Sequence, residues 1–139
     1  MLKIIKALFV AIKAHKGQKD KGGKPYIFHP IRVSLNAQDY DAKVVALLHD
    51  LIEDTDYKIE DLDFLNENQK EALLLLTHDE DASYLDYVID IKKNKIARCV
   101  KLADLEQNMN LKRLKRVTEK DLRRVEKYKK AKSILLEEE

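Results

Sequence analysis

Residues 46–55, ALLHDLIEDT, place four ionisable side chains among apolar ones. His49 and Glu53 are four residues apart, and Asp50 and Asp54 have the same spacing. On a helix of about 3.6 residues per turn this spacing predicts one compact patch of an imidazole and three carboxylates. Such a patch is expected to face a metal, a partner or a cleft, because burying these groups without a partner is costly. The alternative is a helix end whose acids face solvent.

A second acid interrupts an apolar segment in residues 96–109, IARCVKLADLEQNM. Asp104 lies among apolar side chains, and Asn108 follows one turn later on the same face of the predicted helix. A carboxylate in this position needs a partner. Lys101, three residues earlier, and a metal ion are both candidates.

Two features near the amino terminus could complete a site. His29 precedes Pro30, a residue favoured in the first turn of a helix, so His29 is either a capping or packing residue or a ligand. Residues 17–26, GQKDKGGKPY, predict a loop whose glycines let the backbone approach a ligand and whose lysines meet negative charge. A lysine-rich surface loop would have the same composition.

The composition predicts which elements position these residues. A chain of 139 residues that is 45% hydrophobic, with three Gly and two Pro, favours an all-α, single-domain helical bundle over residues 1–139. Ile5, Leu8, Phe9 and Ile12 are expected to form the buried face of a helix over residues 2–16. Capping residues predicted for later helices are Asp41, Ser83 and Thr118, and further helices are expected over residues 66–77 and 96–109.

Charge is segregated along the chain although the net charge is only +2. Residues 1–38 hold eight Lys and Arg against one acid, residues 39–90 hold three against sixteen, and residues 112–132 hold eleven against three. An acidic middle between basic flanks suits a metal-dependent enzyme with a phosphorylated substrate. The alternative is charge that solvates helix faces, which we favour for residues 112–132. We expect no nucleic-acid binding there, because no recognised motif is present.

The cysteine content and the length of the apolar runs bear on where the protein is located. Cys99 is the single cysteine and cannot form an intrachain disulfide, which fits a reducing compartment. The longest apolar run near the amino terminus is six residues, Ala7 to Ile12, far from the roughly 20 needed to cross a bilayer. We therefore expect a cytoplasmic protein without membrane contact.

Taken together, two histidines and two aspartates from separate segments form a mixed nitrogen and oxygen ligand set, which suits a divalent transition metal. The chain resembles the HD-domain phosphohydrolases, and among them the hydrolase domain of Rel/Spo-type alarmone enzymes and the free-standing small alarmone hydrolases. Three blocks carry the resemblance in the family's order: AHKGQKDKGGKPYIFHP, ALLHDLIEDT and VKLADLEQNM. The resemblance implies four metal ligands, His29, His49, Asp50 and Asp104, with Mn²⁺ as the usual metal.

The resemblance also implies a reaction. Glu53 and Asp54 match the family's catalytic acids, and we assign the general-base role to the pair because two adjacent carboxylates titrate together. Lys21 and Asn108 match positions that contact the substrate, whereas Tyr26 is expected to be structural. Family members of this kind remove pyrophosphate from the 3′ position of guanosine tetra- or pentaphosphate (ppGpp, pppGpp), the alarmones of the stringent response.

The chain departs from the family's pattern at three positions. Asp20 stands where alarmone hydrolases usually carry Arg, and Leu105 and Gln107 stand where Arg and His are often found. A different nucleotide or a dinucleotide phosphate is therefore an alternative substrate. A catalytically silent nucleotide-binding module is a further alternative, which the presence of Glu53 and Asp54 disfavours. No synthetase domain follows the third block, so we expect hydrolysis only. The sequence leaves a homo-oligomer open.

Overall fold

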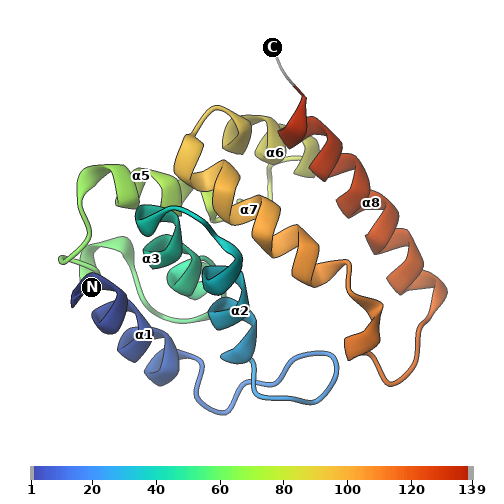
Figure 1. Ribbon diagram of the computed structural model, residues 1–139, viewed down its shortest axis with the longest axis horizontal. Helices are drawn as coiled ribbons and strands as arrows, with labels where there is room; N and C mark the ends of the chain where they lie inside the picture. Colours follow the sequence, from blue (N-terminus) through green and yellow to red (C-terminus); the bar gives the residue numbers. More distant parts are fainter. Residues whose placement is uncertain (1, 138–139) are drawn as a thin grey trace.

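The helix at the centre of the protein, α3 (Tyr40–Leu48), is buried on nearly all sides. Six of its nine residues lie in the core: Ala42, Val44, Val45, Ala46, Leu47 and Leu48. A helix that is apolar all round must be covered by other elements. In the computed structural model, α3 packs against α1 (Leu2–Ala14), α2 (Phe28–Asn36), α5 (Glu67–Leu76) and α7 (Lys95–Asn108) (Figure 1).

The other elements extend this core past α7. They are α4 (Leu51–Asp54), η1 (Ile59–Asp61), α6 (Tyr84–Lys92), η2 (Leu111–Arg113) and α8 (Glu119–Leu136). Helices α6 and α8 pack against each other and against α7. The structure describes residues 2–137, without the side chain of residue 113. Within that range all regular elements are helical, beside one isolated bridge between Lys19 and Pro25, so the all-α prediction is confirmed.

Local sequence signals set the starts of four α-helices, α5 to α8. The side chains of four N-cap residues each accept a hydrogen bond from the backbone N–H three residues on: Asn66, Ser83, Asn94 and Thr118. The predicted caps Ser83 and Thr118 are therefore confirmed. The prediction for Asp41 is wrong, because Asp39 is the N-cap position of α3. The Asp41 carboxylate instead accepts a hydrogen bond from Nε2 of the buried Gln69 at 2.9 Å.

The predicted buried face of α1 is largely wrong. Ile5, Phe9 and Ile12 are 43%, 69% and 47% exposed, whereas Ala7 and Ala11 are fully buried. Apolar residues occur on more than one face of this helix, so periodicity alone did not identify the face that packs. The two alanines let the backbone of α1 approach α3 closely, which the larger side chains would prevent.

The predicted continuous helix over residues 46–55 is also wrong. Helix α3 ends at Leu48 and α4 begins at Leu51, so His49 and Asp50 form a break between them. The backbone N–H of His49 bonds to Ala46, three residues back, and Asp50 has φ −102° and ψ 1°, outside the helical region. The chain therefore changes direction at the pair of residues that the sequence marks as chemically important.

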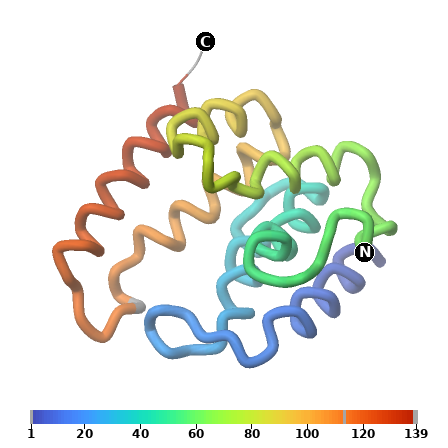
Figure 2. The backbone as a smooth tube through the Cα atoms, turned by 180° about the vertical axis from the view of Figure 1, so that it is seen from behind, coloured from blue at the N-terminus to red at the C-terminus, as the bar shows by residue number. Residues whose placement is uncertain are grey.

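The loop between α1 and α2 crosses to the far end of α7. Seen from the front and from behind, this blue segment lies beside the orange turn that follows α7 (Figures 1 and 2). Its two glycines with positive φ, Gly17 at +86° and Gly23 at +84°, supply the conformations that the reversals require. Over the described residues, no helix is both long and apolar enough to cross a membrane.

Two adjacent leucines of α5 test this packing. Leu73 is fully buried and Leu74 is 51% exposed. We expect Leu73→Ala to lower the free energy of unfolding by about 2–5 kcal/mol, because it leaves a cavity in the core. Leu74→Ala, the matched control, should change it by about 0.5 kcal/mol or less. Urea denaturation measures both, and equal effects would contradict the orientation of α5.

Candidate functional site

The break between α3 and α4 turns two neighbouring side chains toward one point. Nδ1 of His49 donates a hydrogen bond to the carbonyl oxygen of Ala46 at 2.6 Å, which leaves the lone pair of Nε2 facing inward. This Nε2 lies 3.0 Å from Oδ2 of Asp50. Successive side chains of a continuous helix point about 100° apart, so the contact depends on the break.

Two side chains from other helices reach the same point. His29, in the first turn of α2, places Nε2 2.9 Å from Oδ1 of Asp104 on α7. The same Oδ1 lies 3.2 Å from Nε2 of His49. The ligating atoms of these three buried residues all lie within 4.8 Å of one another. Asp50 borders them, with Oδ2 3.9 Å from Nε2 of His29. Three of the four residues predicted as ligands thus converge, and Asp50 lies beside them.

This donor set fits a divalent cation. The carboxylates of Asp50 and Asp104 both face Nε2 of His49. Burial alone would lower the pKa of His49, but the two carboxylates raise that pKa well above its usual value, so the interior favours a positive charge here, which a proton or a metal ion can supply. Imidazole nitrogens and carboxylate oxygens together suit a divalent transition metal. The residues His29, His49 and Asp104 can therefore hold such an ion.

Asp104 pairs with Lys101, one of the two partners that the sequence left open, and its other oxygen faces the candidate metal ligands. Its Oδ1 faces the histidines and accepts a hydrogen bond from Nδ2 of Asn108 at 3.0 Å. Its Oδ2 pairs with Nζ of Lys101, also at 3.0 Å. Burial would raise the pKa of Asp104, but Lys101 and the histidines outweigh it and lower the pKa well below its usual range. The carboxylate therefore stays charged in the interior.

Tyr26 has a closer connection to the site than the sequence indicated. Its ring lies between those of His15 and His29, with centroid distances of 4.9 and 5.7 Å. Its hydroxyl donates a hydrogen bond to Oδ2 of Asp50. An outer residue that holds a ligand in this way fixes the ligand's orientation. No local pattern could reveal this contact, because it joins residues 24 positions apart.

The loop before α2 is shaped by Asp20. Oδ1 of Asp20 accepts hydrogen bonds from the backbone N–H groups of Gly22 at 2.9 Å and Lys24 at 3.0 Å. An aspartate that bonds to its own backbone in this manner stabilises a tight turn. The departure from the family's Arg thus has a structural role, and the next residue, Lys21, lines a cavity.

His29, His49 and Asp104 form a cluster of candidate metal ligands. Glu53 and Asp54 lie on α4, at the outer side of this cluster. The carboxylate of Glu53 accepts a hydrogen bond from the backbone N–H of His78. Partial burial raises the pKa of Glu53, and the negative charge of Asp50 raises it further. The same two causes raise the pKa of Asp54. Both carboxyls thus bind a proton more readily than a free side chain, as a general base beside negative groups does.

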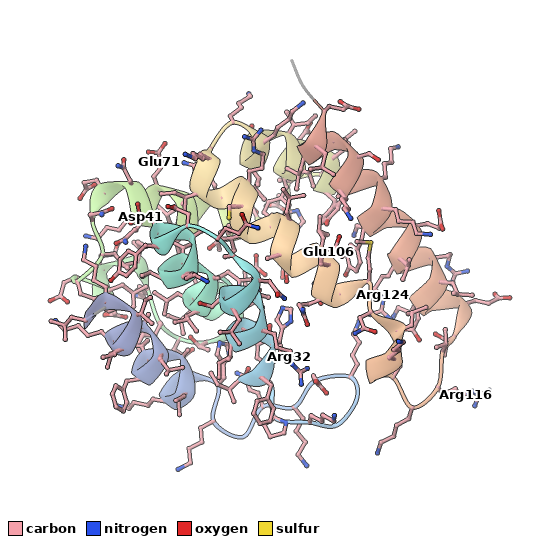
Figure 3. All side chains as sticks on the ribbon, viewed as in Figure 1. Arg32, Asp41, Glu71, Glu106, Arg116 and Arg124 are labelled. Carbon is pink, nitrogen blue, oxygen red and sulfur yellow. The ribbon has the colours of Figure 1, made fainter. Side chains whose placement is uncertain are left out.

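Two cavities adjoin the cluster. The first, of about 250 Å³, lies between the α1–α2 loop and the facing ends of α7 and α8, and Lys21, Asn108 and Arg124 are among its lining residues. Arg124 lies on α8 beside the end of α7 (Figure 3). The second, of about 200 Å³, is bordered by His49 and Glu53 on one side and by α6 and α8 on the other. Asn108 and Tyr128 line both cavities.

Helix α8 contributes residues that sequence reasoning missed. We interpreted the basic residues of 112–132 as solvating charge, yet Arg124 lines the first cavity and Lys127 the second. Tyr128, the residue after Lys127, lines both cavities. The aromatic residue beside two cations was the available signal, but only the packing of α8 reveals which face carries it.

The cluster predicts metal binding that depends on His49. We expect wild-type protein to bind Co²⁺ with the visible absorption of a nitrogen and oxygen site, and His49→Gln to weaken binding at least about tenfold. The control is His78→Gln, which removes an imidazole outside the cluster. Equal Co²⁺ affinities of the two variants would refute the cluster as the metal site.

Tyr26 predicts a smaller effect on the same measurement. Tyr26→Phe removes the hydrogen bond to Asp50, and we expect Co²⁺ affinity to fall about tenfold. Tyr87→Phe is the matched control, because its hydroxyl donates to the carbonyl of Leu76 and not to the cluster. If both variants bound Co²⁺ like the wild type, Tyr26 would have no part in holding Asp50.

Relatives of known name match part of the chain. No protein-family model matches it. A guanosine-3′,5′-bis(diphosphate) 3′-pyrophosphohydrolase of Borreliella burgdorferi is 42% identical over 77 residues, 52% of this chain and 11% of the relative. A protein of the same name from Haemophilus influenzae is 51% identical over 57 residues, 38% and 8%. The bifunctional (p)ppGpp synthase/hydrolase SpoT of Escherichia coli is 44% identical over 63 residues, 42% and 9%. The chain thus spans about a tenth of the length of these relatives.

A solved structure matches nearly all of the chain. It is that of a metazoan orthologue of SpoT that hydrolyses ppGpp, with a TM-score of 0.80 and 25% identity over 98% of this chain and 86% of the other. The HD-type helical fold is therefore confirmed. In sequence over about half of its length, and in fold over nearly all of it, this chain is similar to the Rel/SpoT-type alarmone hydrolases, as its three sequence blocks indicated.

Proposed function

We propose that the protein is a metal-dependent hydrolase that removes pyrophosphate from the 3′ position of guanosine tetra- or pentaphosphate. The observation that carries the proposal is the convergence of His29, His49 and Asp104 beside cavities with cationic side chains. The names of the relatives supply the reaction and the substrate class. We take residues 1–139 as one phosphohydrolase domain.

The metal in this proposal is Mn²⁺, held by His29, His49, Asp50 and Asp104. A divalent ion in such a site acidifies water and stabilises negative charge on phosphoryl oxygens. Nδ1 of His49 keeps its hydrogen bond to Ala46 throughout, so the imidazole presents the same nitrogen to the ion. Tyr26 holds Asp50 in place.

Glu53 and Asp54 form the general-base pair of the proposed reaction. The pair accepts the proton of the attacking water, whose oxygen forms a new bond to the inner phosphorus of the 3′-diphosphate. The bond between that phosphorus and the 3′ oxygen breaks, and a proton ends on the 3′ oxygen. A base with a raised pKa is able both to take the proton and to return it.

The nucleotide occupies the first cavity in this proposal. Lys21 provides positive charge for phosphates, and Arg124 lines the cavity in an ion pair with Asp121. The amide of Asn108 lies between the cavity and Asp104. Asp20 also lines this cavity, and its charge favours a second candidate substrate, another nucleotide or a dinucleotide phosphate. The two candidates differ in what the cavity accepts and share the chemistry at the metal.

The cysteine content and the cavity linings bear on the location and the partners of the protein. The single cysteine fits a cytoplasmic protein, and the basic residues of α8 that line cavities favour a nucleotide over nucleic acid as partner. A nucleotide-binding module without catalytic activity is less consistent with two carboxylates of raised pKa beside the candidate metal ligands.

Turnover by the Mn²⁺-loaded protein tests the proposal. We expect release of pyrophosphate from ppGpp, and a fall in kcat of about 10²–10⁴-fold in Asp54→Asn with little change in Mn²⁺ affinity. Asp56→Asn, an exposed acid two residues further on, is the control and should behave like the wild type.

A panel of other nucleotide 3′- and 5′-phosphates separates the candidates. Turnover of another nucleotide with ppGpp untouched would favour the second substrate class. Full activity of Asp54→Asn would contradict the assigned base. The absence of turnover on the whole panel would contradict a hydrolase and support a protein that only binds nucleotides.

A further inference from the structure

The second cavity contains polar groups that the proposed reaction does not use. The hydroxyl oxygen of Tyr84 is buried and has no hydrogen-bond partner among the described residues. A buried hydroxyl without a partner is destabilising, so it indicates a missing acceptor or donor. Tyr84 lines the cavity that borders His49 and Glu53.

Two ammonium groups lie beside the aromatic wall of this cavity. Nζ of Lys127 is 4.0 Å from the centroid of the Tyr84 ring, and Nζ of Lys101 is 5.2 Å from that of Tyr87. Lys101 is held inside by its pair with Asp104, and only 12% of its side chain is exposed. Lys127, an exposed residue of α8, also lines the cavity. The rings hold both cations in place.

The lining of the cavity, whose volume is about 200 Å³, favours an anion. Two ammonium groups and a free hydroxyl are donors to phosphoryl oxygens. Asp50 and Glu53 also border the cavity and oppose an anion, so a divalent cation at the cluster has to offset them.

We propose that this second cavity binds the pyrophosphate group of the substrate and of the product, with Lys127 and the Tyr84 hydroxyl as its direct contacts. The inference rests on the proposed function, because it places the nucleotide in the first cavity and the diphosphate in the second, with the candidate metal ligands beside both. Asn108 and Tyr128, which line both cavities, lie at the boundary between the two parts of the substrate. Lys127 is then a residue that favours a diphosphate over a single phosphate.

Binding of inorganic pyrophosphate tests this subsite without turnover. Titration calorimetry compares wild-type protein, Lys127→Met and Tyr84→Phe at one fixed concentration of free Mn²⁺, so that chelation of the metal by pyrophosphate cancels in the ratios. We expect the dissociation constant to rise about tenfold in Lys127→Met and about threefold in Tyr84→Phe. Lys129→Met is the matched control, because Lys129 on the same helix is 61% exposed and pairs with Glu126.

The affinity for inorganic phosphate should change less than that for pyrophosphate in Lys127→Met. Equal pyrophosphate affinities of Lys127→Met and Lys129→Met would overturn the subsite, even if the protein hydrolyses ppGpp. Conversely, a loss specific to Lys127→Met supports the subsite even if ppGpp is not the substrate. The two proposals therefore fail separately.

Discussion

The buried carboxylate of Asp104 is the constraint on which the rest of the site depends. A negative charge in the interior requires compensation, and Lys101 supplies one positive charge through Oδ2. Oδ1 faces two imidazoles, from α2 and from the end of α3, so these helices meet α7 at the carboxylate. The central position of α3 follows from its apolar surface, but the polar contacts fix which ends of the three helices come together. A cation held among them would complete the balance of charge.

Local sequence features predicted the helical fold and two of the helix caps. Long-range contacts determined the features that the sequence did not predict. Caps such as Ser83 and Thr118 depend on three or four neighbouring residues, and the sequence identifies them. The break at His49 and Asp50 was missed, because helical periodicity continues through it and only tertiary contacts favour the turn. The predicted ligands still come together, because their types and order were informative although the assumed helix was wrong. Tyr26 and Lys127 reach the site from distant segments, which no spacing rule reveals.

The segregation of charge along the chain becomes a segregation in space around the site. The acidic middle supplies Asp50, Glu53 and Asp54 beside the metal cluster. The basic flanks supply Lys21 and the cations of α8 at the two cavities. Asp50 and Glu53 meet the cations Lys101 and Lys127 at the second cavity, and in our proposal the scissile bond lies there, between the metal ligands and the anion-binding groups. Asp20 is an exception, since its carboxylate stabilises the loop that presents Lys21.

The central claim is that one divalent ion joins α2, α3 and α7 and that hydrolysis occurs beside it. Anomalous diffraction at the manganese absorption edge, from crystals of the Mn²⁺-loaded protein, tests that claim most directly. The account predicts one strong peak within about 2.0–2.3 Å of Nε2 of His29, Nε2 of His49 and a carboxylate oxygen of Asp104. A peak elsewhere with this cluster empty, or the absence of any peak at saturating Mn²⁺, would contradict it.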